Sequence, residues 1–266
     1  ETLIKRGFKS ITLLGQNVNS YGLDRTGAEM RFAELLAAIG QMGRVADDPF
    51  WVYYTSPHPR DMTRDVLEVM AEYDCIGKQV HLPLQSGDDR VLLKMNRQHS
   101  LKAYREIVHS IRDLMPEATL FTDIIVGFTG ETDAQFENTL KALREFRFNM
   151  IYFAKYSPRP GAASSRWIDD IPYAVKGARL QRVNDCAIEH SLEWNQRYLG
   201  KTMPVLVTGL DRKQENLSGL TEGKVNVRIP GTDTSQIGKR VDVRMTGAIP
   251  FCLSGERVAA QALVGS

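Results

Sequence analysis

The sequence contains few cysteines and no long apolar run. Its 266 residues include only three cysteines, at positions 75, 186 and 252. None of them has the short spacing of a metal site, and their odd number argues against a disulfide framework. We therefore predict a protein of the reducing cytoplasm in which each cysteine is a buried structural thiol. No apolar stretch is long enough to cross a bilayer, which argues against a membrane protein.

Other signatures of chemistry are also absent. No cluster of His, Asp and Glu has metal-ligand spacing, and there is no Ser-His-Asp arrangement and no phosphate-binding loop. The formal net charge is only +2, but residues 198–266 hold nine Lys and Arg against six Asp and Glu. A basic C-terminal part is compatible with an anionic partner, and equally with an ordinary solvated surface.

Strand and helix patterns alternate along the first two thirds of the chain. The expected strands are residues 10–14, 50–54, 80–84, 120–128 and 150–156. Helix patterns separate them, with Ser100 as an N-cap and Thr132 with Gln135 as a capping box. This alternation implies right-handed crossovers and a parallel sheet. We predict the α/β class, with residues 1–172 as a partial parallel (β/α) barrel that lacks its first strand because the chain opens on a helix end.

The pattern changes after residue 172. Residues 173–197 predict one long linking helix. Residues 198–266 predict a small all-β barrel, because short strands and glycines replace the helix signals. The expected strands of this second unit are residues 203–208, 218–220, 224–229, 240–246 and 257–260.

Each predicted strand of the first unit ends in polar residues or glycine. Barrel strands direct these ends to one rim, where enzymes place their ligand-binding groups. Gln16, Asn17 and Gln85 can both donate and accept hydrogen bonds, which suits an amino-acid-like ligand or a ribose. Arg97 and Arg159 offer planar guanidinium groups for a carboxylate. We therefore predict one ligand site at this rim.

Several further rim residues have two readings. Asp123 lies inside an apolar strand and needs a partner from the protein or from a ligand. Gly127 and Gly130 would let the backbone approach a flat ring closely. His58 and His81 fit a catalytic role, but structural histidines explain them more simply. The rim therefore looks like a cofactor site without the group that performs the chemistry.

Five motifs occur in a fixed order along this unit. They are LLGQNVNSYG (13–22), TSPHP (55–59), HLPLQSG with MNR (81–87, 95–97), TDIIVGF with GET (122–128, 130–132) and YSPRPG (156–161). Together they resemble the radical-SAM methylthiotransferases, in particular the tRNA-modifying, MiaB-type branch. The C-terminal part resembles the TRAM domain, a small RNA-binding β-barrel that ends these enzymes. Thr129 and Ala162 depart from the family's usual Pro and Thr, which affects only loop detail.

The resemblance implies a radical reaction dependent on S-adenosylmethionine (SAM). Its product is a methylthio group on carbon 2 of an N6-isopentenyl-type adenosine beside the tRNA anticodon. Family members carry two 4Fe–4S clusters on cysteine thiolates, one of them on a CxxxCxxC triplet. Neither cysteine set occurs in this sequence. We therefore expect this chain, taken as a fragment, to bind no metal with its own residues and to be inactive alone.

The resemblance also assigns site residues. The first two strand ends correspond to contacts with the methionine part of SAM, the third to its carboxylate and ribose, and the fourth to its ribose and adenine. The expected cofactor-binding residues are Gln16, Asn17, Ser56, Gln85, Ser86, Arg97, Asp123, Val126, Gly127, Phe128 and Arg159. The expected RNA-binding residues are Lys201, Arg212, Lys213, Lys224, Arg228, Lys239, Arg240 and Arg244. The expected partner is a tRNA anticodon stem-loop. We expect the protein to be a monomer that does not associate with a membrane.

Three alternatives stay open. A related branch methylthiolates an aspartate of a ribosomal protein, although Asn17-Val18-Asn19 stands where that branch usually has Asp-Thr. The chain would alternatively be only an RNA-binding module, whose affinity falls steeply with salt. A conventional aldolase-type barrel is the weakest alternative, because no lysine or metal set is suitably placed.

Overall fold

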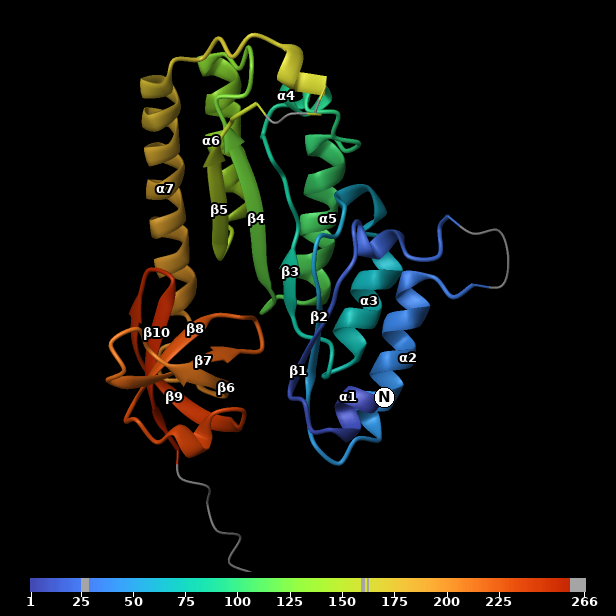
Figure 1. Cartoon of the computed structure of the whole chain (residues 1–266), viewed down its shortest axis with the longest axis vertical. Helices are drawn as coiled ribbons and strands as arrows, with labels where there is room; N and C mark the ends of the chain where they lie inside the picture. The colour runs from blue at the N-terminus through green and yellow to red at the C-terminus, as the bar shows by residue number, and fades with distance from the viewer. Residues whose placement is uncertain (25–28, 159–160, 162, 259–266) are drawn as a thin grey trace, which may run out of the picture.

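The computed structural model describes residues 1–24, 29–158, 161 and 163–258 (Figure 1). Its first unit contains five parallel strands, of which the first two pair together and the last three form a second sheet. An isolated bridge links Val52 of β2 to Ile76, three residues before β3 begins. The predicted α/β class with a parallel sheet is thus confirmed. The strands are β1 (Ser10–Leu13), β2 (Trp51–Tyr54), β3 (Gln79–His81), β4 (Thr119–Val126) and β5 (Met150–Lys155).

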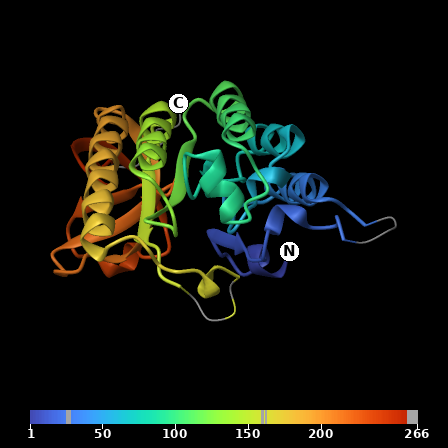
Figure 2. The same cartoon turned by 90° about the horizontal axis from the view of Figure 1, so that it is seen from above.

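Helices cover the outer face of this curved sheet, as the view from above shows (Figure 2). The two predicted caps are confirmed: the Ser100 hydroxyl accepts the amide of Ala103, and Thr132 with Gln135 forms a capping box. These caps satisfy amide groups that a helix N-terminus otherwise leaves without partners. The helices are α1 (Thr2–Lys5), α2 (Phe32–Arg44), α3 (Arg64–Glu72), α4 (Asp89–Lys94), α5 (Leu101–Leu114), α6 (Asp133–Phe146) and α7 (Tyr173–Gln196), with short 3₁₀ turns η1 (Val18–Ser20), η2 (Pro59–Asp61), η3 (Ala163–Arg166) and η4 (Thr234–Gln236).

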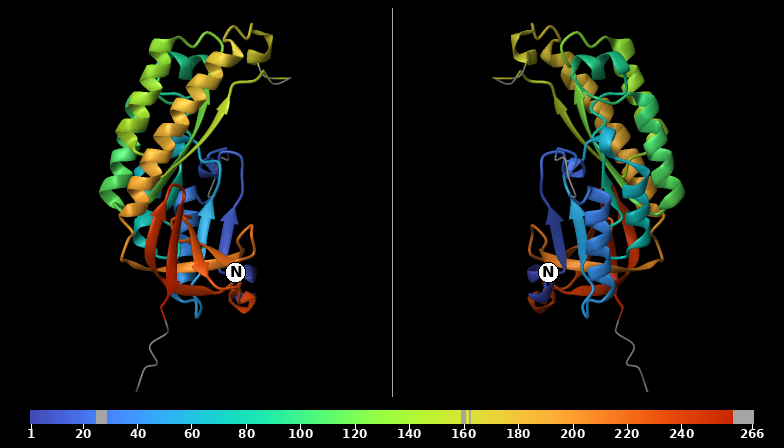
Figure 3. Two further views of the ribbon diagram at one scale, coloured as in Figure 1. Left: turned by 90° about the vertical axis from the view of Figure 1, so that its left-hand side faces the viewer. Right: turned by 90° about the vertical axis from the view of Figure 1, so that its right-hand side faces the viewer.

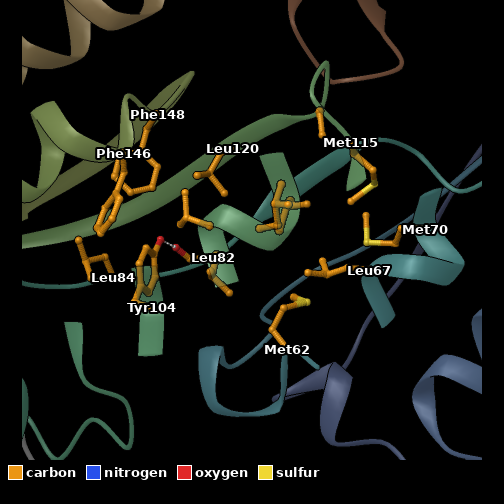
Figure 4. Close-up of a cluster of buried hydrophobic side chains, with 14 of the residues drawn as sticks. Met62, Leu67, Met70, Leu82, Leu84, Tyr104, Met115, Leu120, Phe146 and Phe148 are labelled. Atoms are coloured by element: carbon orange, nitrogen blue, oxygen red, sulfur yellow. Dashed lines mark hydrogen bonds between the residues drawn. The ribbon is translucent and has the colours of Figure 1, made fainter. Parts of the chain in front are cut away.

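The main core lies between the sheet and these helices (Figure 4). Tyr104 of α5 is fully buried and donates its hydroxyl to the carbonyl of Leu82 at 2.7 Å. Phe146 and Phe148 pack against the same ring. Burial of each such side chain contributes about 1.5–3 kcal/mol. This contact fixes the segment after β3, which forms one wall of the rim.

Strand β3 is shorter than its predicted span of 80–84. It ends at His81 because Pro83 has no amide for the ladder and the Leu84 amide bonds the Thr122 hydroxyl instead, at 2.9 Å. The chain then returns to β4 for a single bridge between Gln85 and Ile124. The irregular segment turns Gln85 into a left-handed conformation with φ 72°.

The second unit is a closed five-stranded barrel in the order β10-β8-β7-β6-β9. The predicted last strand at 257–260 is wrong: β10 begins at Cys252, directly after a tight turn at Pro250 and Phe251, and ends at Arg257. Residues 259 and 260 lie outside the described part. The strands are β6 (Thr202–Leu210), β7 (Asn216–Thr221), β8 (Asn226–Pro230), β9 (Arg240–Ile249) and β10 (Cys252–Arg257).

The barrel docks on the concave face of the parallel sheet. Val52 and Tyr54 of β2 belong to the main core, so the alternate residues Trp51 and Tyr53 point to the opposite, concave face. There both pack with Leu206 of the barrel in a separate buried cluster. Figure 3 shows the barrel against the lower halves of β1 and β2. The barrel therefore covers the N-terminal end of the sheet and leaves the opposite rim open.

Hydrogen bonds reinforce this junction. The Tyr53 hydroxyl donates to the carbonyl of Glu222 at 2.8 Å, and the Thr119 hydroxyl donates to the carbonyl of Gly223 at 2.7 Å. Helix α7 holds the other side, where Asn195 donates to the carbonyl of Ile249 at 2.8 Å. The two units are thus joined by apolar and polar contacts on two sides.

Candidate active site

The rim is built from residues in an unusual backbone conformation. Asn17, Ser56 and Gln85 each follow a strand and have φ values of 50°, 55° and 72°. Left-handed backbone costs energy for residues other than glycine and is concentrated at functional sites. Three successive strand ends therefore carry the same kind of strain on one side of the molecule.

A cavity of 340 Å³, which we call the central cavity, lies between these strand ends. It brings together five of the eleven predicted cofactor-binding residues, from segments far apart in sequence. Barrel topology explains the convergence, because parallel strands bring their carboxyl ends to one rim. The five residues are Asn17, Ser56, Gln85, Arg97 and Asp123.

The polar groups of the central cavity are incompletely satisfied. His81 Nε2 lies 2.9 Å from Asp123 Oδ2, so this carboxylate has a protein partner. By contrast, Gln85 Oε1, Arg97 Nε and His99 Nδ1 are buried without any hydrogen-bond partner. A buried polar atom without a partner costs about 1–3 kcal/mol. Three such atoms at one cavity indicate that a polar ligand completes the site.

The charges of the central cavity respond to burial. Burial lowers the pKa of Arg97, which the nearby Asp123 carboxylate partly offsets. Burial also lowers the pKa of His99 to about 4, although the carbonyl of Leu84 accepts a hydrogen bond from its ring. His99 is therefore neutral at pH 7, with Nε2 as the donor and the buried Nδ1 as a free acceptor.

A second cavity of 640 Å³, which we call the upper cavity, shares Arg97 with the first. Three aromatic side chains line it: the Phe128 ring lies 4.7 Å from that of Tyr156 and 5.9 Å from that of Trp167. Ile125 and Ala154 add further apolar surface. This chemistry suits a flat heterocycle, whereas the central cavity suits carboxylate and hydroxyl groups.

Together the two cavities fit SAM. Its methionine part offers a carboxylate, its ribose offers hydroxyl groups, and its adenine is a flat ring. Arg97 lies between the two cavities and can donate to a carboxylate, while Gln85 and Asp123 can bond hydroxyl groups. The three unpartnered buried atoms belong to residues that line the central cavity.

Other predicted cofactor residues lie elsewhere. Gln16 lines a separate surface hollow after β1. Ser86 is fully buried and its hydroxyl lies 3.3 Å from that of Thr139, so it holds helix α6 in place and lines neither cavity. Val126 is fully buried in the main core. Arg159 lies outside the described residues.

The structure gives a reason for glycine at position 127 that differs from the predicted close approach of a flat ring. It has φ 70°, and a Cβ added there would lie 2.4 Å from Cγ of Lys176 on α7. Its amide donates to Glu131, which in turn pairs with the buried Arg179. The missing side chain therefore makes room for α7, and the loop holds Phe128 toward the upper cavity.

Sequence reasoning missed several cavity residues. His99 lines the central cavity, and Tyr156 and Trp167 line the upper one. Tyr156 belongs to the YSPRPG motif, so that motif contained the signal. Nothing local singles out His99 or Trp167, because the segments that follow α4 and η3 bring them in from outside the strand ends.

The eight predicted RNA-binding cations divide into two groups. Lys224 lies over the ring of Tyr53 and Arg240 over that of Trp51, while Lys201 pairs with Glu117 at 3.3 Å. These three contact the first unit and belong to the junction between the units. The remaining five are exposed on the barrel: Arg212, Lys213, Arg228, Lys239 and Arg244.

Comparison with known proteins agrees with this architecture. The profile of the Radical SAM superfamily matches residues 1–143, more than half of the chain. The chain belongs to the radical SAM superfamily. Membership implies SAM and an iron–sulfur cluster as the cofactors of the family. The TRAM domain profile matches residues 196–258 of this radical SAM chain, over the small barrel.

Three curated relatives share the printed name tRNA-2-methylthio-N(6)-dimethylallyladenosine synthase. Those of Clostridium botulinum (strain Okra) and Thermus thermophilus are each 40% identical, over 96% and 98% of this chain and 56% and 55% of the relative. That of Oceanobacillus iheyensis is 41% identical over 96% of this chain and 48% of the relative. The radical SAM chain thus spans about half the length of the curated relatives it matches. The predicted resemblance to the tRNA-modifying methylthiotransferases is confirmed.

A solved archaeal structure, the Elp3 of Methanocaldococcus infernus with an N-terminal deletion, aligns with a TM-score of 0.46. The match has 14% identity and covers 70% of this chain and 47% of that one.

The described residues do not offer ligands for an iron–sulfur cluster. Within the described ranges no group of three or more His, Cys, Asp or Glu side chains could hold a metal ion. The free cysteines 75 and 186 are buried, and Cys252 is only partly so, contrary to the prediction that all three are buried. Among the helices of the same described ranges, none has the length and apolarity that a membrane span requires.

Proposed function

We propose that this chain supplies the SAM-binding and RNA-binding parts of a tRNA methylthiotransferase. The reaction is addition of a methylthio group to carbon 2 of N6-isopentenyladenosine beside the anticodon. The observation that carries the proposal is a cavity with three unpartnered buried polar atoms at one end of a parallel sheet whose other end carries a docked TRAM barrel. The shared name of the curated relatives supports the same substrate.

The cofactor assignment follows from the chemistry of the cavities. Arg97 and Gln85 hold the carboxylate and ribose of SAM, with Asn17 and Ser56 near its methionine end and Phe128 beside its adenine. SAM supplies the methyl group and the radical precursor when it is bound. The chain's own contribution is to orient this cofactor and to exclude water from it. Iron–sulfur clusters are proposed for the whole enzyme, on ligands outside the residues described above.

The RNA assignment rests on the five exposed cations of the barrel. The partner is a tRNA anticodon stem-loop, because the barrel docks on the concave face of the sheet whose opposite rim holds the central cavity. The logarithm of the affinity falls with the logarithm of the salt concentration. Each lost phosphate contact should make this slope shallower by about 0.7–0.9. Replacing Arg212 and Lys213 with Ala should therefore make the slope shallower by about 1.4–1.8 and weaken binding. Binding that does not change with salt contradicts this assignment.

A transfer assay with the full-length enzyme tests the activity. Undermodified tRNA and a ribosomal protein are offered in parallel with labelled SAM. Label on the tRNA supports the proposal, whereas label on a ribosomal-protein aspartate replaces it with the alternative branch. Binding of RNA without any transfer reduces the chain to an RNA-binding module. We further propose a cytoplasmic monomer, with units at 1–172 and 198–266 joined by the helix at 173–197.

A further inference from the structure

A strip of side chains on the concave face runs beside the central cavity, to which its residues His81 and Asp123 belong, and lies outside the contacts with the docked barrel. Its centre is Tyr152 of β5, which is 49% exposed although it lies in the middle of a strand. The Tyr152 ring lies 5.5 Å from that of His81 and 6.3 Å from that of Phe121. Strand register explains the grouping, because Tyr152 pairs with Asp123 and Phe121 pairs with His81.

The strip lies between the docked barrel and the central cavity. Along β4, Thr119 donates its hydroxyl to the barrel at Gly223, and four residues later Asp123 lines the central cavity. Residues 119, 121 and 123 share one face, and four residues of strand span about 13 Å. Tyr152 therefore lies beside an uncovered step between the RNA-binding barrel and the cofactor cavity. A nucleotide that reaches from the barrel to the cavity along this face would pass over it.

The chemistry of the strip suits an unpaired purine. Enzymes that modify a base take it out of the stack and hold it between aromatic and apolar side chains. The half-exposed Tyr152 ring offers such a stacking face, and Phe121, which is 6% exposed, supports it from below. At its edge the His81 ring is bonded to one carboxylate oxygen of Asp123, which leaves the other carboxylate oxygen as an acceptor. The adenine of SAM has a separate aromatic wall at Phe128, so the two rings do not compete.

We propose that Tyr152 is the stacking platform for the substrate base of the tRNA, and thereby a specificity-determining residue of the reaction. This inference deepens the proposed function and rests on it. The hydroxyl of Tyr152 has no part in stacking, so Tyr152→Phe should preserve the role and Tyr152→Ala should remove it. Tyr173 provides a matched control: it is 76% exposed, begins α7 and lines neither cavity.

The test measures binding of two RNA hairpins to the chain by fluorescence. Both carry the anticodon stem-loop sequence; one has 2-aminopurine at the reacting position and the other an abasic site with a distant dye. Wild type should bind the first more tightly, and stacking should quench its fluorescence. Loss of one stacked base typically weakens binding by about 5- to 140-fold. Tyr152→Ala should therefore raise the Kd of the first hairpin by at least about fivefold and leave that of the abasic hairpin unchanged.

The outcomes separate this inference from the function beneath it. Tyr152→Phe and Tyr173→Ala should bind both hairpins as wild type does. If Tyr152→Ala fails to fold, Tyr152→Leu replaces it, because leucine keeps apolar bulk without an aromatic face. Equal weakening of both hairpins, or no weakening of either, overturns the platform while RNA binding stands. No binding of either hairpin by wild type overturns the RNA-binding function itself, and the platform with it.

Discussion

Replacing Glu131 with Gln should destabilise the protein by about 3 kcal/mol. The Glu131 carboxylate pairs with Arg179 at 2.8 Å, and the two side chains are only 1% and 6% exposed. Burial raises the pKa of Glu131, a shift that the Gly127 amide and the Arg179 guanidinium oppose. Removing one partner of a buried pair typically costs about 3–5 kcal/mol, because the other charge stays buried. Asp133 still pairs with Arg179 at 2.7 Å, which places the expected loss at the lower end.

Thermal unfolding followed by circular dichroism measures this loss. For a chain of this size about 3 kcal/mol corresponds to a fall in Tm of about 6–12 °C. The matched control is Glu137→Gln, which removes another ion pair to helix α7. There Glu137 and Arg182 are 41% and 48% exposed, so water screens the pair and its loss should cost much less than that of the Glu131 pair. Equal shifts in the two variants would refute the argument that burial makes the Glu131 pair important.

Three further predictions concern the cavity and the cofactors. Arg97→Gln should raise the Kd for SAM by about 10- to 100-fold in titration calorimetry, because a charged hydrogen bond is lost. The control Arg90→Gln, at an exposed position, should change this Kd little. Equal effects of the two substitutions would remove Arg97 from the site. His99 has a folded pKa of about 4, below its ordinary 6.5, so the unfolded chain takes up the proton first and stability should fall as pH drops from 6.5 to 4. The loss should be roughly 1–2 kcal/mol after allowance for partial exposure, and His99→Gln should lack it; parallel Tm curves against pH for the two proteins contradict this. Finally, anaerobic reconstitution of the chain with iron and sulfide should give no 4Fe–4S absorbance, and a stable brown species would overturn that expectation.

Local signals predicted much of the fold. The strand and helix alternation, the Ser100 cap and the Thr132 capping box depend on residues close in sequence, so the pattern itself contains them. Where prediction went wrong, a local feature was overridden or misread. Pro83 and the side chain of Thr122 ended β3 early. The turn at Pro250 lets the last strand begin earlier in the chain than predicted.

The candidate site was predicted in part for the same reason. Strand ends of a parallel barrel meet at one rim, so Asn17, Gln85 and Asp123 could be grouped from the order of elements alone. The sequence could not show that Ser86 bonds Thr139, because that contact joins segments 53 residues apart. His99 reaches the cavity only through the packing of the helix beside it.

By itself the sequence determined the family, the two units and the residue types available for a ligand. The tertiary structure decided what each residue does with its neighbours. Lys224 and Arg240 illustrate the difference, because in sequence they are basic residues of an RNA-binding barrel and in space they lie over Tyr53 and Trp51. The physical reason is that a charge or a ring takes its role from what is packed against it. Those contacts are made between segments that the chain keeps far apart.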